Sequence, residues 1–317
     1  MARLGQSVTA ANPVSPALPE GLRDAILAWY DARGRSLPFR GTTDPYAVLV
    51  SEVMAQQTQI SRVGPAWTAF MAAFPTIRDL SAASPADVLR AWRGMGYNRR
   101  ALNLWRTARV VVEEHGGQLP SDVAALERLP GVGRYTARAV AAIAFGAPVG
   151  AVDTNVRRVL GRAVGGAIDA LPATELQRVA DAAVPAGRTA EWTHALMDVG
   201  ATFCRTTRPL CPECPARTWC RFAAAAPGAG RAVAPGAGRA MPRRARRVSP
   251  FPSTSRWLRG RIMDRLREVE GAGWVVIDAP IGAHDRSAIA RTLEELAAEG
   301  LVELDIASRR GARLPVG

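Results

Sequence analysis

The chain has 317 residues, enough for one large domain or two smaller ones with buried cores. It carries 41 basic and 28 acidic residues, a formal net charge of +13, and every basic residue is Arg because no Lys occurs. No uncharged apolar stretch is long enough to span a membrane and no signal-peptide pattern is present, so we expect a cytoplasmic protein. A GC-rich genome explains Arg in place of Lys, but it does not explain the excess of basic residues, which favours a polyanionic partner.

Composition divides the chain into segments. Residues 1–20 are rich in Ala and Pro and are predicted to form a disordered arm. Residues 21–222 contain consecutive amphipathic helical patterns, with prolines at or near several helix starts, and no lasting strand-like alternation. The predicted fold class is therefore all-α. Residues 223–256 form a basic linker rich in Ala, Pro, Gly and Arg, which either stays solvated or holds nucleic acid non-specifically.

Residues 257–317 are predicted to form a small winged-helix-like module. Its expected parts are, in order, a helix, a short apolar run, a second helix and a two-stranded wing, at 257–269, 274–277, 287–299 and 301–314. Three basic residues, Arg309, Arg310 and Arg313, are expected near the tip of the wing.

Within the helical part, two helical patterns at 122–128 and 134–145 flank the sequence Leu-Pro-Gly-Val-Gly at 129–133. Gly131 and Gly133 permit backbone torsions that a side chain would forbid and allow close approach of another backbone. The N–H groups that open the second helix then suit an anion such as a phosphate, which the helix dipole also favours. Such a contact is independent of base sequence. The motif therefore predicts binding to a nucleic-acid backbone, and the alternative is an ordinary turn.

The four cysteines form one C-x6-C-x2-C-x5-C run: Cys204, Cys211, Cys214 and Cys220. In the cytoplasm thiols stay reduced, which disfavours disulfides, and thiolates select zinc or iron–sulfur clusters. Structural zinc sites usually combine two close pairs, and only Cys211 and Cys214 form such a pair here. A compact single loop suits a cubane cluster better, so we predict a cluster with a structural role.

Several motifs occur in a characteristic order, namely SEVMAQQTQ at 51–59, GMGY at 94–97, LPGVGRYTA at 129–137, VDTNV at 152–156 and the cysteine run. With them, residues 21–222 resemble the helix–hairpin–helix DNA glycosylases that share a conserved aspartate, and among these the MutY-type adenine DNA glycosylases. The resemblance implies two helical subdomains with a [4Fe-4S] cluster loop at 204–220. It also implies a monomer whose partner is double-stranded DNA with adenine opposite 8-oxoguanine or guanine.

Such an enzyme turns the adenine out of the duplex before it cleaves the glycosidic bond in base excision repair. The resemblance assigns Glu52 as the acid that protonates N7 of adenine, and the apolar run at 47–50 favours its protonated form. Asp153 would stabilise the oxocarbenium-like sugar, electrostatically or through a transient covalent bond. Tyr135 and Asn155 are implied as further catalytic residues. From the residues alone, Glu52 could instead be an N-terminal charge on a helix, although its apolar run favours function. Asp153 could be a helix cap, and Tyr135 could be a packing residue.

The residues that the resemblance assigns to DNA or substrate binding are Arg35, Arg40, Gln56, Gln57, Thr58, Tyr97, Gly131 and Gly133. Gln57 and Tyr97 would insert near 8-oxoguanine, and Thr58 would contact it. The two arginines would line the DNA or the base pocket. Without the motif, both glutamines would be taken for surface amides.

Related enzymes that resemble endonuclease III have a Lys where this chain has Tyr135, and its amine attacks the sugar and cleaves the strand. This chain has no Lys. We therefore expect a monofunctional glycosylase without β-lyase activity, in which water is the final nucleophile and an abasic site is the product.

The chain departs from the family pattern at Phe39, Ala55 and His194, three positions expected to border the base pocket. Many family members also have a larger C-terminal domain that recognises 8-oxoguanine, and the segment after residue 222 is too short for that fold. Recognition should then depend on Gln57, Thr58 and Tyr97, with help from the C-terminal module. We expect weaker discrimination between 8-oxoguanine and guanine opposite adenine.

Two other functions stay open. A thymine glycosylase acting on T opposite G also has a Tyr at the hairpin, although the QQTQ run favours adenine. A non-catalytic DNA-binding protein could use an iron–sulfur cluster for redox sensing, but such a protein has no need of both Glu52 and Asp153 close to DNA phosphates.

Overall fold

A computed structural model describes residues 17–225, 250–271, 273–277, 280–305 and 311–316 of the chain. These residues form two compact units. Unit 1 comprises the described residues of Met1–Arg35 and Gly146–Ala234, and unit 2 comprises those of Ser36–Phe145 and Pro235–Gly317. Most of the predicted N-terminal arm and basic linker lies outside the described residues. No helix in the described part of the chain is long and apolar enough to cross a membrane.

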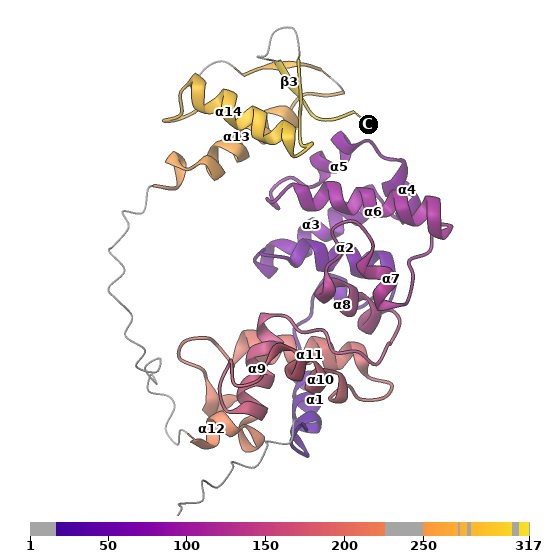
Figure 1. Cartoon of the computed structure of the whole chain (residues 1–317), viewed down its shortest axis with the longest axis vertical. Coiled ribbons are helices and arrows are strands. Elements are labelled where there is room, and N and C mark those ends of the chain that lie inside the picture. Colours follow the sequence, from indigo (N-terminus) through magenta and orange to yellow (C-terminus); the bar gives the residue numbers. More distant parts are fainter. Residues whose placement is uncertain (1–16, 226–249, 272, 278–279, 306–310, 317) are drawn as a thin grey trace, which may run out of the picture. The chain divides into compact units, whose positions relative to one another are not determined.

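Unit 1 consists of helices around one apolar core. Its elements are α1 (Leu22–Arg33), α9 (Thr154–Gly165), α10 (Ala173–Ala182), α11 (Thr189–Thr202), α12 (Arg221–Ala225) and two short 3-10 helices, η2 (Cys211–Glu213) and η3 (Arg217–Trp219), and the helices are labelled in Figure 1. Helix α11 packs against both α9 and α1. Trp192, Leu160 and Ile26 have almost no exposed surface in this core.

The main part of unit 2 is also helical. Its elements are η1 (Pro38–Arg40), α2 (Pro45–Ala55), α3 (Ile60–Ala73), α4 (Ile77–Ala82), α5 (Pro85–Ala91), α6 (Arg99–His115), α7 (Val123–Glu127) and α8 (Arg134–Ala144). Helix α2 packs against α3, α6 and α8, and every residue from 46 to 54 is buried. A helix that is buried on all sides requires apolar side chains all round. Apart from Ser51 and Glu52, the residues of this stretch are apolar or aromatic.

The all-α prediction for residues 21–222 is confirmed, since every regular element described there is a helix. The hairpin at 129–133 lies between α7 and α8, as the flanking helical patterns predicted. Helices α2 and α5 begin at Pro45 and Pro85, where the missing proline N–H costs no hydrogen bond.

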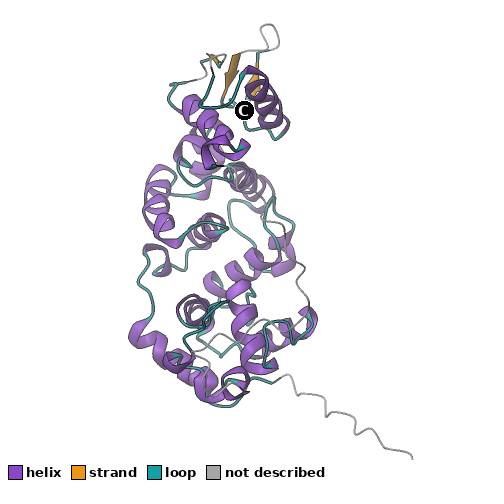
Figure 2. Cartoon of the chain, turned by 90° about the vertical axis from the view of Figure 1, so that its left-hand side faces the viewer, coloured by secondary structure: helices purple, strands orange, loops and turns teal. Residues whose placement is uncertain are grey.

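The C-terminal module contains the short strands of the described structure (Figure 2). Its elements are η4 (Phe251–Ser253), α13 (Ser255–Arg267), β1 (Val275–Val276), α14 (Arg286–Ala298), β2 (Glu303–Leu304) and β3 (Gly311–Arg313). The strands form one antiparallel sheet in the order β1-β3-β2, with Val275 opposite Ala312 and Glu303 opposite Arg313.

The module thus has the winged-helix-like character that the sequence predicted. The predicted apolar run at 274–277 adds a third strand to the expected two-stranded wing. Arg313 lies in β3, where it forms a 2.7 Å ion pair with Glu303 and its guanidinium lies 4.4 Å from the Trp274 ring centroid. Arg309 and Arg310 are outside the described residues.

Two arginines fasten the module to α5 and to the start of α6. Arg267 is 8% exposed and donates from Nε to the Leu89 carbonyl and from a terminal nitrogen to Asn98 Oδ1, both at 2.8 Å. In the opposite direction, Arg90 donates to the carbonyls of Val269 and Gly271 at 3.0 and 2.7 Å. These bonds place α13 beside the loop that precedes α6.

Candidate active site

Glu52 is brought to a buried position by α2. The helix begins with Pro45, and the Asp44 carboxylate caps it by accepting from the N–H groups of Tyr46 and Ala47 at 3.2 and 3.3 Å. Glu52 is 9% exposed, and the Tyr135 hydroxyl donates to its Oε2 at 2.8 Å. The fold therefore joins two of the predicted catalytic residues, which lie 83 positions apart in the sequence.

The helix–hairpin–helix turn explains how Tyr135 reaches Glu52, because α8 starts directly after the turn and packs on α2. Gly131 has φ 75°, and a Cβ there would lie 2.6 Å from Asn103 Cβ, so this position requires glycine. Gly133 differs from the expectation: its φ of −90° is open to any residue, and a Cβ would have no atom within 4 Å.

The open space at Gly133 lies at the N-terminus of α8. No side chain caps that terminus in the described structure. The first N–H groups of a helix have no partner within the helix and carry the positive end of its dipole. This end of α8 can accept an anion, and the absence of a Cβ at Gly133 leaves room for it to approach.

Asp153 lies in unit 1 as the N-cap of α9 and is partly buried. Its Oδ1 accepts from the Val156 N–H at 2.7 Å, and its Oδ2 accepts from the Asn155 side-chain amide at 2.9 Å. The expected capping role and the link to Asn155 are thus combined in one carboxylate. Backbone donors at a helix start stabilise a negative charge.

Arg158, one turn further along α9, connects this carboxylate to the cysteine loop. It donates to Asn155 Oδ1 at 2.8 Å and to the Gly200 carbonyl at 2.7 Å. It also donates from Nε to the Cys204 carbonyl. A continuous set of hydrogen bonds therefore runs from Asp153 through Asn155 and Arg158 to the first cysteine.

The four cysteines line one small cavity, about 20 Å³, together with Arg162, Phe203, Arg217, Phe222 and Ala223. Arg162 is 5% exposed and donates to Cys204 Sγ at 3.4 Å and to the carbonyls of Arg205 and Thr206 at 2.7 and 3.1 Å. Its guanidinium lies 4.7 Å from the Phe222 ring centroid. A cation directed at the cysteines suits a group bound by thiolates.

Burial raises the pKa of the Cys214 thiol to about 12, and it also raises the pKa values of Cys211 and Cys220. As free thiols these groups are protonated at neutral pH, so a thiolate-bound group must displace their protons. Among the described residues, no set of three or more His, Cys, Asp or Glu side chains is already arranged to hold a metal ion. The shared cavity nevertheless provides four soft sulfur ligands, the donor set that iron–sulfur clusters use.

Two loops in unit 2 expose the side chains that were assigned to DNA contacts. Gln57 and Tyr97 have φ values of 53° and 45°, in a region that non-glycine residues seldom adopt. Gln57 is exposed, and the Tyr97 side chain is 47% exposed although it is large and aromatic. Gln56 is held differently, since its amide donates to Thr136 Oγ1 in α8 at 3.1 Å. Strained, exposed residues of this kind often mark functional loops.

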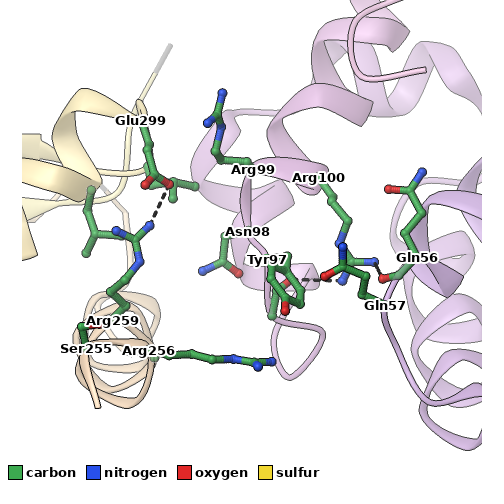
Figure 3. Close-up of a pocket in the computed structure, with 14 residues that line it drawn as sticks. Gln56, Gln57, Tyr97, Asn98, Arg99, Arg100, Ser255, Arg256, Arg259 and Glu299 are labelled. Carbon is green, nitrogen blue, oxygen red and sulfur yellow. Dashed lines mark hydrogen bonds and ion pairs between the residues drawn. The ribbon is translucent and has the colours of Figure 1, made fainter. Parts of the chain in front are cut away.

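Arg100, which the sequence did not single out, holds the two loops together (Figure 3). Its guanidinium donates, at 2.6–3.2 Å, to the Thr58 hydroxyl and to the carbonyls of Val53, Met54, Gln56, Met95 and Gly96. Burial lowers the pKa of Arg100 to about 10, so it stays charged at neutral pH. The only sequence signal was its place after GMGYN, which it shares with Arg99.

Other predicted residues have structural partners. Arg35 donates to both carboxylate oxygens of Asp198, from its backbone N at 3.0 Å and from Nε at 2.6 Å. Asp198 is fully buried and therefore needs this partner. Phe39 is buried with its ring 6.2 Å from the Trp67 ring, and His194 is buried in α11. Arg40, in η1, is partly buried.

Comparisons with known proteins identify relatives of this chain. A model of the HhH-GPD superfamily of base excision DNA repair proteins matches residues 50–179. The adenine DNA glycosylase of Mycolicibacterium smegmatis is 41% identical over 280 residues, which cover 88% of this chain and 91% of that protein.

Solved structures also match. A thermostable thymine-DNA glycosylase has a TM-score of 0.61 at 30% identity and covers 64% of this chain and 95% of its own. A trapped covalent intermediate of endonuclease III with DNA has a TM-score of 0.56 at 26% identity. The match covers 64% of this chain and 94% of that chain. With its hairpin, its Glu52–Tyr135 pair and a relative that matches over most of both lengths, the chain belongs to the adenine DNA glycosylase family of the HhH-GPD superfamily.

Proposed function

We propose that this DNA glycosylase removes adenine mispaired opposite 8-oxoguanine or guanine and leaves an abasic site. The observation that carries the proposal is the buried Glu52 carboxyl, bonded to the Tyr135 hydroxyl in a member of this family. An uncharged adenine leaves a sugar far more readily than an anionic one, so the reaction needs an acid at the base. A carboxyl in a desolvated site keeps its proton more readily than one in water.

In the proposed reaction Glu52 donates its proton to N7 of the adenine as the glycosidic bond breaks. The Tyr135 hydroxyl holds the Glu52 carboxyl in position through its 2.8 Å bond. Asp153 supplies the negative charge that stabilises the cationic sugar, with Asn155 holding its Oδ2. Water then adds to C1′ of the sugar, and the proton that it releases replaces the one that Glu52 gave to the base.

We propose that the enzyme is monofunctional. A glycosylase that also cleaves the strand uses an amine to form a Schiff base with the sugar, and this chain has no Lys. The residue of the hairpin helix that meets Glu52 is Tyr135, whose phenol cannot form such an adduct. Borohydride treatment during turnover is therefore expected to trap no covalent protein–DNA adduct, and a trapped adduct would contradict this part of the proposal.

The proposed DNA contacts come from the hairpin and from the loops that Arg100 holds. The start of α8, at Gly131 and Gly133, binds a backbone phosphate. Gln57, Thr58 and Tyr97 meet the base opposite the adenine, with Gln56 supporting them through its bond to Thr136. Arg40 is proposed to line the base pocket. Arg35 is proposed to support the same region, because its pairing with Asp198 anchors the chain just before η1.

We propose that Cys204, Cys211, Cys214 and Cys220 hold a [4Fe-4S] cluster with a structural role. Their shared cavity and the Arg162 contact to Cys204 Sγ support this assignment. When bound, the cluster orders the loop between α11 and α12, and no step of base removal passes through it. We further propose that the enzyme works in the cytoplasm on nucleoid DNA, where its substrate lies and where thiols stay reduced.

Thymine removal opposite guanine is the alternative function, favoured by the 30% identity to a thymine-DNA glycosylase structure. The deciding experiment measures single-turnover base release from duplexes with A opposite 8-oxoguanine, A opposite G and T opposite G. We expect adenine release from the first two duplexes, loss of that release in Glu52→Gln and normal release in Glu113→Gln, an exposed control. Thymine release would replace the proposal, and no release from any duplex would favour a non-catalytic DNA-binding protein.

A further inference from the structure

A cavity of about 660 Å³ lies in unit 2 between the Tyr97 loop and the C-terminal module. The loop side contributes Gln57, Tyr97 and Arg99, and the module side contributes Arg256 and Arg259 of α13. Figure 3 shows Arg256 extending from α13 toward Tyr97. The cavity therefore adjoins the side chains that are proposed to meet the base opposite the adenine.

The charges around this cavity are unbalanced. Four arginines line it, at positions 99, 100, 256 and 259, whereas its only acidic lining residue among those described is Glu299. That carboxylate is already paired with Arg259 at 2.7 Å. Arg99 and Arg256 are exposed, and neither has an acidic partner in the described part of the chain. Two guanidinium groups are thus available to an anion.

The position of Arg256 is set by the fold. Helix α13 is capped by Thr254, whose side chain accepts from the Trp257 N–H at 3.3 Å, and Arg267 fastens the same helix to α5 and Asn98. The Arg256 guanidinium lies 5.0 Å from the Tyr97 ring centroid, within cation–π range. This contact holds the positive charge beside an aromatic ring that is itself 47% exposed.

We propose that this cavity binds the phosphodiester backbone of the strand opposite the adenine, next to the mispaired base, with Arg99 and Arg256 as phosphate ligands. The proposal rests on the proposed function, which places Gln57 and Tyr97 at that base. A guanidinium binds a phosphate through two parallel N–H donors and keeps its charge. The C-terminal module then takes part in DNA binding through the first turn of α13.

The test is the salt dependence of binding by the full chain to a duplex with 8-oxoguanine opposite a non-cleavable 2′-fluoroadenosine. Each lost phosphate contact lowers the slope of log K against log salt concentration by about 0.9. We expect that decrease for Arg256→Ala and for Arg99→Ala, and about twice that decrease for the double variant. Arg265→Ala removes another exposed arginine of α13, one that does not line the cavity, and should leave the slope unchanged.

Replacing single phosphates of the duplex by neutral methylphosphonate linkages identifies the strand that the cavity binds. Placed beside the base opposite the adenine, they should weaken binding by the unsubstituted chain, weaken binding by each single variant less, and cause no further loss in the Arg99→Ala/Arg256→Ala double variant. Unchanged slopes in both single variants, or sensitivity confined to linkages in the adenine strand, would overturn the assignment. Adenine release by the unsubstituted chain checks the proposed function separately: release with unchanged slopes removes only this inference, and absent release removes the proposed function on which it rests.

Discussion

The two carboxylates assigned to the reaction, Glu52 and Asp153, lie in opposite surroundings. Glu52 belongs to a helix that is buried all round, and a neutral phenol donates to it. Asp153 is partly exposed at a helix start, where a backbone N–H and a side-chain amide donate to it. Burial therefore separates the two carboxylates, and each is oriented by its own hydrogen-bond donors. The same chemical group can thus be placed in a closed or an open setting by the helix that carries it, which suits the different roles proposed for the two residues.

Each carboxylate is also supported by an arginine that donates to backbone carbonyls. Arg100 ties the end of α2 to the Gln57 and Tyr97 loops, and Arg158 ties the start of α9 to Gly200 and the cysteine loop. A planar guanidinium has five N–H donors, so one side chain can hold several chain segments at once. The same construction thus occurs once in each of the two units.

The strongest test of the contrast is Glu52→Gln. It keeps the shape of the side chain and an oxygen that accepts from Tyr135, but it removes the acid. We expect adenine release to slow by about 10²–10⁴-fold, the usual contribution of general acid catalysis. The measurement is the single-turnover rate opposite 8-oxoguanine, with melting temperature as the check on folding. A loss below tenfold would show that Glu52 is not the proton donor.

For Asp153, the variant Asp153→Asn separates the effect of the negative charge from the effect of capping α9. Asn caps a helix about as well as Asp, so we expect little change in the free energy of unfolding. The single-turnover rate should nevertheless fall by about 10²–10³-fold, because a charge that stabilises the transition state is lost. Asp153→Ala should lose a similar factor in rate and in addition about 1 kcal/mol of stability. Equal rates for Asp153→Asn and the unsubstituted chain would leave Asp153 with a capping role only.

Arg100→Gln tests whether Arg100 acts by holding the two loops in place and not in the chemical step. The variant leaves several partly buried carbonyls without their donor, so we expect a loss of about 1–3 kcal/mol in the free energy of unfolding. It should also weaken binding to the mispaired duplex by about tenfold or more, with a smaller effect on the rate at saturating enzyme. Arg99→Gln is the neighbouring control for stability, since Arg99 is exposed. A rate loss as large as that of Glu52→Gln would contradict a purely positioning role.

Tyr135→Phe should have the smallest effect. It removes one hydroxyl from the Glu52 carboxyl, and a single hydrogen bond of this kind contributes about 1 kcal/mol, equivalent to roughly fivefold to tenfold in rate. The single-turnover rate is compared with that of Tyr46→Phe, whose hydroxyl donates to the Phe74 carbonyl away from Glu52. If Tyr135→Phe matched Glu52→Gln, the phenol itself would take part in proton transfer.

Much of the fold followed from local patterns. Prolines marked helix starts, as at Pro45 and Pro85, and the hairpin lay between the two helices that its flanks predicted. Gly131 needs its left-handed torsion, as predicted, whereas Gly133 has an ordinary torsion. Pattern alone cannot separate the two, because the torsion at each position depends on how α7 and α8 pack. The domain boundaries and the DNA contacts stay predictions.

The helical class, the order of the motifs and the available chemical groups could be predicted from the residues alone: two carboxylates, a hairpin tyrosine and four clustered thiols. The partners of those groups depended on how the helices pack. In the folded chain Glu52 is bonded to Tyr135, and Arg158 connects the Asp153 end of α9 to Cys204. Arg35 pairs with the buried Asp198, and Arg100 is bonded to backbone carbonyls whereas Arg99 is exposed. The physical reason is that periodicity and caps act over one helical turn. Burial and hydrogen bonding join residues that are distant in the chain, so partners emerge only when the helices pack.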